Sequence, residues 1–136
     1  QFYLNSQETV LENVTLPLKI AKVPKAERNR RGIEVLEQLD MGDKIKAKAT
    51  NLSGGQQQRV SIGRALINSP EILFADEPTG NLDSETSAVV EDLLFGLNAE
   101  GQTLIVVTHD EDLAIKCDRQ IRIQDGLIIE DKVANR

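Results

Sequence analysis

The sequence predicts an α/β fold that carries a helical lobe and a C-terminal β-hairpin. Two short apolar runs, Ile72–Ala75 and Thr103–Val107, are typical of strands that are buried on both faces. A segment with helical periodicity separates them, and the order strand, helix, strand indicates a parallel sheet. Residues 7 to about 50 show only helical patterns, so we expect them to form a separate helical lobe.

The lobe is predicted to contain two helices. Thr9 and Glu12 have the spacing of a capping box, which places the start of the first helix, and Pro17 is expected to end or kink it. The second helix is expected over about residues 26–40, with Gly42 as its stop. Their apolar faces consist of Leu11, Val14 and Leu18 in the first helix and Val35, Leu36 and Leu39 in the second.

The rest of the chain alternates helices and strands. A helix is expected from about Gly54 to Asn68, where Ser69–Pro70 halts it. Asp83 is expected to cap a helix that Gly101 ends, and its apolar positions are Val90, Leu93, Leu94 and Leu97. A short helix is expected over 112–117. A hairpin is expected over 120–130, with its turn at Asp125–Gly126.

Length and composition exclude several classes of protein. The 136 residues are 40% hydrophobic and 28% charged, which indicates one domain or slightly less of folded chain. The net charge of −6 disfavours a nucleic-acid partner. No apolar run approaches the roughly 20 residues that span a bilayer, so we expect any membrane role to be peripheral. A single cysteine, Cys117, and a single histidine exclude an internal disulfide and cysteine-cluster or multi-histidine metal sites.

Two adjacent carboxylates, Asp76 and Glu77, follow the first predicted strand. Ligands in open α/β sheets lie beyond the carboxyl ends of the strands. One carboxylate can hold Mg²⁺ and the other can orient or deprotonate an attacking water, which is what hydrolysis of a phosphoanhydride requires. Two solvated surface acids are the alternative interpretation.

A second motif runs from Leu52 to Arg59 and contains Ser53, Gly54, Gly55 and Gln56. Ser53 and Gln56 have capping-box spacing, and the free N–H groups of a helix start form an anion site. Glycines let a ligand approach the backbone closely. An ordinary capped helix would have the same pattern. The third motif places His109 after the second predicted strand, where it could bond a phosphate oxygen or could be purely structural.

Together these motifs resemble those of the ATP-binding cassette (ABC) ATPases. Residues 52–56 are similar to the family's LSGGQ signature, and 72–77 to its Walker B strand with the catalytic glutamate. Asn81–Leu82–Asp83 resembles the D-loop, and His109 the switch histidine. Gln1 resembles the glutamine of the Q-loop, so residues 1–6 are assigned to that region and 51–136 to the C-terminal half of the core. The segments 11–18, 56–58 and 76–83 resemble the lipoprotein-releasing, macrolide-export and cell-division branch.

One motif of the family is absent from the 136 residues. No segment has the phosphate-loop pattern G-x-x-x-x-G-K-[ST], which the family places before the Q-loop. The chain is therefore expected to be the C-terminal part of an ABC ATPase. It is expected to be inactive alone, since the backbone N–H groups that cradle the phosphates are missing, and to self-associate through its incomplete sheet.

The resemblance implies a role for each motif. Two ATPase subunits would sandwich ATP and Mg²⁺, with Asp76 and Gln1 near the metal and Glu77 polarising the attacking water. His109 would contact the γ-phosphate, and Asp83 would lie at the nucleotide-binding interface. The signature residues of the opposite subunit, Ser53, Gly54, Gly55 and Gln56, would bind that phosphate.

The resemblance also implies partners and a location. The helical lobe would receive a transmembrane permease subunit at the cytoplasmic face of the membrane. A translation- or DNA-associated ABC protein and a catalytically dead regulatory fragment are the alternatives.

Overall fold

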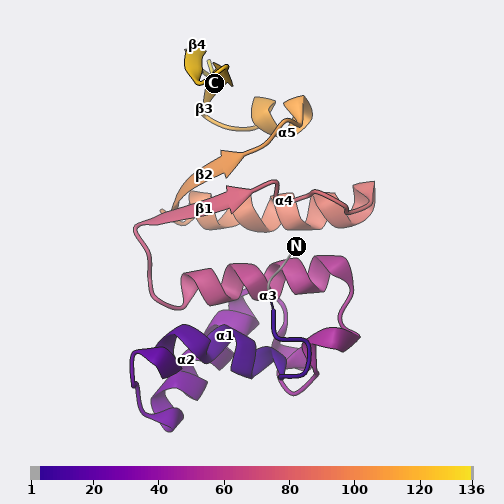
Figure 1. Ribbon diagram of the computed structural model, residues 1–136, viewed down its shortest axis with the longest axis vertical. Coiled ribbons are helices and arrows are strands. Elements are labelled where there is room, and N and C mark those ends of the chain that lie inside the picture. The colour runs from indigo at the N-terminus through magenta and orange to yellow at the C-terminus, as the bar shows by residue number, and fades with distance from the viewer. Residues whose placement is uncertain (1–3, 136) are drawn as a thin grey trace.

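The computed structural model describes residues 4–135 and has the predicted α/β architecture (Figure 1). Its helices are α1 (Val10–Ile20), α2 (Lys25–Gln38), α3 (Gly54–Leu66), α4 (Ser84–Ala99) and α5 (Glu111–Ile115), with two 3₁₀ turns, η1 (Gly42–Lys44) and η2 (Ala49–Asn51). Its strands are β1 (Ile72–Asp76), β2 (Thr103–Val107), β3 (Arg119–Gln124) and β4 (Leu127–Val133). β1 and β2 are parallel, whereas β3 and β4 form the antiparallel hairpin.

The start of α1 is the predicted capping box. The Glu12 N–H donates to Thr9 Oγ1 at 3.1 Å, and the Thr9 N–H donates to Glu12 Oε1 at 3.2 Å. Both bonds satisfy donors that have no partner within the helix. Pro17 lies inside α1 and does not end it, since the helix continues to Ile20.

The end of α2 differs from the prediction that Gly42 stops this helix. α2 ends at Gln38, and Asp40 adopts a left-handed conformation with φ of 58°. This conformation turns the chain so that the Met41 N–H donates to the Leu36 carbonyl at 2.7 Å. The aspartate therefore takes the position that a glycine usually fills at helix ends, and Gly42 begins the next 3₁₀ turn.

The parallel pair is covered on one face only. Leu73 and Ala75 of β1 are buried in the same core as the apolar face of α4. Ile72 and Phe74 point the other way and are exposed, as are Ile105 and Val107 of β2. The expectation that both strands are buried on both faces is therefore wrong for the described residues, because helices pack on one side of the pair and no described element covers the other.

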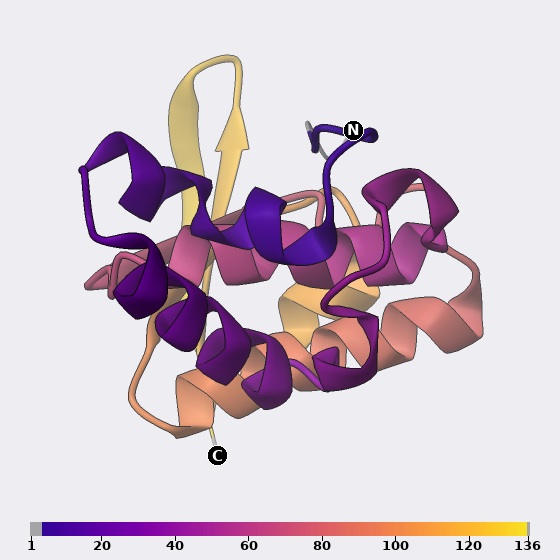
Figure 2. The same cartoon turned by 90° about the horizontal axis from the view of Figure 1, so that it is seen from below.

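One continuous hydrophobic core joins the helices to the strands. α3 lies between the α1–α2 pair and α4 (Figure 1), and the view from below in Figure 2 has α1 and α2 in front of the other helices. The core contains residues from five elements, namely Val14 of α1, Leu36 of α2, Val60 of α3, Leu73 of β1 and Leu94 of α4. Helix α3, which carries the signature-like motif at its first turn, is thus packed on two sides.

The remaining elements follow their predicted caps and turns. Asp83 is the N-cap of α4, and Gly101, with φ of 107°, follows its end. Asp125 and Gly126 both have positive φ, as a two-residue hairpin turn requires. Among residues 4–135 no helix has the length and apolar character needed to cross a membrane.

Candidate functional site

The centre of the site is the turn that follows β1. The Glu77 N–H donates to the Val107 carbonyl at 2.7 Å, which extends the pairing of β1 with β2 by one bond. Glu77 then has φ of 47°, a left-handed conformation that is uncommon for a residue with a side chain. The Gly80 N–H closes a turn onto the Glu77 carbonyl at 3.0 Å. Strained backbone of this kind persists where surrounding bonds hold it, and it is frequent at functional sites.

The Glu77 carboxylate is held by residues that follow β2. Its Oε1 lies 2.6 Å from His109 Nδ1 and accepts the His109 backbone N–H at 3.0 Å. Its Oε2 accepts the Thr108 hydroxyl at 3.2 Å, and that hydroxyl in turn accepts the Asp110 N–H at 3.0 Å. The structure therefore brings Glu77 and His109 together, although 32 positions separate them in the sequence.

The pairing leaves the histidine ring accessible. The His109 side chain is 93% exposed, and its Nδ1 faces the carboxylate, so Nε2 points to no described partner. The Glu77 side chain is 38% exposed. The His109 backbone N–H and ring nitrogen lie at Oε1, and the Thr108 hydroxyl is the one described donor to Oε2, so Oε2 retains capacity for a water molecule.

Asp76 lies at the last position of β1, and it is exposed. The described residues contain no group of three or more His, Cys, Asp or Glu side chains that could hold a metal ion by themselves. A single exposed carboxylate fits Mg²⁺, which keeps several waters and takes its remaining ligands from substrate phosphates. Gln1, the other predicted metal contact, lies outside the described residues.

The signature-like motif forms the first turn of α3. Ser53 Oγ accepts the Gln56 N–H at 3.2 Å, and Gln56 Oε1 accepts the Ser53 N–H at 3.0 Å, so the predicted capping box is present. Within residues 4–135 the N–H groups of Gly54 and Gly55 have no hydrogen-bond acceptor. They are therefore available as anion donors at the positive end of a 13-residue helix.

The two glycines of this motif contact the residues just before and within the start of α4. A Cβ placed on Gly55 would lie 2.3 Å from Thr86 Cγ2, and one on Gly54 would lie 3.2 Å from Leu82 Cδ2. Gly55 is buried, whereas Gly54 is exposed. The sequence predicts that both glycines serve the close approach of a ligand. In the structure, the absent side chain of Gly55 is required by packing within the chain.

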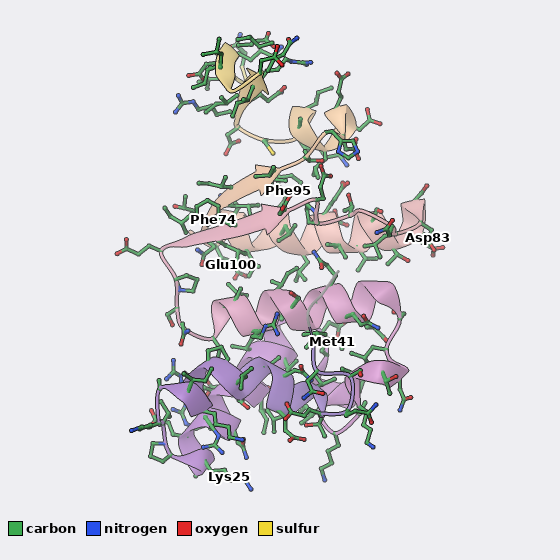
Figure 3. The ribbon with its side chains drawn as sticks, viewed as in Figure 1. Lys25, Met41, Phe74, Asp83, Phe95 and Glu100 are labelled. Carbon is green, nitrogen blue, oxygen red and sulfur yellow. The ribbon has the colours of Figure 1, made fainter. Side chains whose placement is uncertain are left out.

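Asp83 links this contact to the D-loop-like segment. Its Oδ1 accepts the Thr86 N–H at 2.7 Å. Backbone and side-chain hydrogen bonds from Thr86 hold the pKa of the Asp83 carboxyl below its usual range. Figure 3 shows Asp83 at one end of α4 and Glu100 at the other. Asp83 thus lies at the α4 end that contacts the signature-like turn.

Two residues of the site were not found from the sequence. Thr108 bonds the Glu77 carboxylate, and Thr86 packs on Gly55. In the sequence, Thr108 could have been suspected only because it precedes His109. Thr86 could have been suspected only because it is the third helical residue after the capping Asp83. Neither signal reveals the partner, because each contact joins segments about 30 residues apart.

The fold and the site define an ATP-binding cassette protein. A family model described as ABC transporter matches residues 1–80, more than half of the chain, so the chain belongs to this family and the resemblance drawn from the motifs is confirmed. The chain is 46% identical over 131 residues to the uncharacterized ABC transporter ATP-binding protein YvrO of Bacillus subtilis, covering 96% of this chain and 57% of YvrO. It is 50% identical over 131 residues to the macrolide export ATP-binding/permease protein MacB of Aggregatibacter actinomycetemcomitans, covering 96% of this chain and 20% of MacB.

Solved structures agree with these matches. The dimeric post-hydrolysis state of the ATP-binding cassette MJ0796, bound to ADP and Pi, has a TM-score of 0.80 and 42% identity. The match covers 98% of this chain and 60% of that one. The ADP conformation of the cassette MJ1267 shares the fold with a TM-score of 0.84, over 95% of this chain and 56% of that one. This chain thus spans less than two thirds of the cassettes that it matches.

Proposed function

We propose that the complete protein containing this chain is the ATP-hydrolysing subunit of an ABC transporter. The observation that carries the proposal is the carboxylate of Glu77, held by His109 and Thr108 beyond the parallel strands. Asp76, a possible Mg²⁺ contact, immediately precedes it. This is the placement that nucleotide hydrolysis on an α/β sheet requires.

Glu77 is proposed as the general base. Its remaining acceptor position on Oε2 can bind a water and take its proton. The bonds from the backbone N–H and ring of His109 and from the Thr108 hydroxyl fix the carboxylate before the water arrives, so no reorganisation is needed at that moment.

His109 is proposed to contact the terminal phosphate through Nε2. With Nδ1 directed at Glu77, the accessible nitrogen is Nε2, and the exposed ring can present it to a ligand. The same contact restrains the ring, so the position of the histidine depends on the carboxylate.

Asp76 and Gln1 are proposed to lie near Mg²⁺. When it is bound, the ion neutralises charge on the phosphate oxygens. The exposed Asp76 carboxylate can reach it directly or through a water. The phosphate cradle itself is expected to come from a segment with the phosphate-loop pattern, which the 136 residues do not contain.

Ser53, Gly54, Gly55 and Gln56 are proposed to act on the nucleotide of a second cassette, with Asp83 at the same dimer interface. The two free N–H groups at the start of α3 point to an anion contact, and Ser53 and Gln56 hold this turn in shape. The MJ0796 cassette has been solved as a dimer. A permease partner at the cytoplasmic face of the membrane is part of the proposal, in line with the ATP-binding/permease naming of MacB.

The test is Glu77→Gln in the complete protein. The amide keeps the shape of the carboxylate but cannot accept a proton, so Mg-ATP binding should persist while kcat falls by about 10²–10⁴-fold. An ATP-bound dimer should accumulate. The matched control is Glu71→Gln, at an exposed position before β1 and at the opposite end of this strand, which should keep the parental kcat. Hydrolysis by Glu77→Gln at close to the parental rate would refute the assignment.

A further inference from the structure

The signature-like turn and the D-loop-like segment of one chain are packed against each other. Gly55 meets the Thr86 methyl group, and Gly54 meets Leu82, so two consecutive glycines contact two residues of the segment 82–86. The contact at Gly55 is the tighter one, because a Cβ there would be 2.3 Å from Thr86 Cγ2, well inside van der Waals distance. The contact between Gly55 and Thr86 therefore fixes the distance between the first turn of α3 and the first turn of α4.

Thr86 contacts two segments, one through its side chain and the other through its backbone. Its Cγ2 faces Gly55. Its backbone N–H donates to Asp83 Oδ1 at 2.7 Å. Because threonine is β-branched, its χ1 is restricted, so the backbone bond that fixes Thr86 at the cap also restricts where its methyl group lies against Gly55. The residue thereby ties the cap of α4 to the glycine turn of α3.

We propose that Thr86 is a positioning residue that keeps the signature turn in register with the D-loop-like segment of the same chain. The inference rests on the proposed function. In an ATP sandwich, Ser53 and Gly55 serve the nucleotide of the partner, whereas Asp76 and Glu77 serve the nucleotide of their own chain. Thr86 contacts Gly55 and bonds Asp83, which follows Glu77 on the segment that leaves β1, so Thr86 joins the signature turn to that segment.

The experiment is a double-mutant cycle in the complete protein, carried in the Glu77→Gln background so that Mg-ATP drives dimerisation without turnover. The readout is the Mg-ATP concentration at half-maximal dimer. Gly55→Ala places a methyl group against Thr86 Cγ2 and should raise this concentration about tenfold or more. Thr86→Ser removes one methyl group but keeps the hydroxyl, and should raise it about fourfold.

The combined variant decides the proposal. Gly55→Ala with Thr86→Ser removes the clash, so it should recover most of the loss of Gly55→Ala rather than add to it. Thr86→Val keeps the branch that faces Gly55 and should stay within about twofold of the parent, because the backbone bond to Asp83 remains. Gly96→Ala is the matched control, since a Cβ at Gly96 meets nothing within 4 Å.

A second measurement separates positioning from simple stability. Thermal unfolding of each variant without nucleotide reports the packing alone. If the recovery appears in unfolding but not in dimerisation, or if the double variant is no better than Gly55→Ala, the positioning role is overturned. If the Glu77→Gln parent itself shows no Mg-ATP-driven dimer, the proposed function fails instead, and the unfolding cycle still reports the contact.

Discussion

The open face of the β1–β2 pair predicts self-association of the 136-residue chain, and Phe74 is the residue to test. Phe74 is 67% exposed on this face, beside Ile72, Ile105 and Val107, which are also exposed. A continuous apolar strip on two parallel strands is an association site in water. We expect Phe74→Glu to weaken the association, because the substitution replaces the largest apolar side chain of the strip with a charge.

The size of the effect follows from the exposed fraction. Full burial of a phenylalanine stabilises by about 1.5–3 kcal/mol, so covering the exposed 67% contributes about 1–2 kcal/mol in each copy. In a symmetric dimer both copies bury the residue. Phe74→Glu should therefore weaken dimerisation by about 2–4 kcal/mol, a rise in Kd of about 30- to 1000-fold.

Sedimentation velocity over a series of protein concentrations measures this change. The matched control is Ile20→Glu, because Ile20 is 73% exposed and is the last residue of α1, a helix that lies away from the strands (Figure 1). This variant should associate as the parent does. A parental chain that stays monomeric at every concentration, or an equal effect of both substitutions, would show that the open strand face does not drive association.

Three further predictions concern binding, stability and pH. The 136-residue chain should bind Mg-ATP only weakly, because it contains no phosphate-loop pattern; micromolar affinity in calorimetry would contradict this. Leu36→Ala should lower the free energy of unfolding by about 2–5 kcal/mol in urea titrations, because Leu36 is fully buried, while Ile20→Ala should change it by less than about 0.5 kcal/mol. Asp83 has a lowered pKa, so its ionised form stabilises the fold above its ordinary value near 4, and this contribution is lost as the pH falls through the lowered pKa. Asp83→Asn keeps the cap and should lose less thermal stability on acidification; an unchanged acid profile would refute this.

Local rules in the sequence determined most of the secondary structure. Side chains near the start of a helix satisfy its free N–H groups, so capping residues mark where a helix begins. The starts of α1, α3 and α4 were identified in this way, from the pairs Thr9–Glu12 and Ser53–Gln56 and from Asp83. The apolar runs of β1 and β2 and the turn at Asp125–Gly126 identified the sheet and the hairpin. The order of the motifs also identified the family, which the family match confirmed.

Only the tertiary structure decided which of these residues meet. The contact of Glu77 with His109 spans 32 positions, and that of Gly55 with Thr86 spans 31, so no local pattern records them. The exposure of Phe74 was likewise missed, because apolar sequence shows what a strand can bury and not what is present to cover it. The end of α2 at Gln38, with Asp40 rather than Gly42 as the residue that turns the chain, has the same cause, since the left-handed turn at Asp40 brings Met41 into a buried position that packing selects. Caps and periodicity act over a few residues, whereas burial and side-chain partners depend on how distant elements pack.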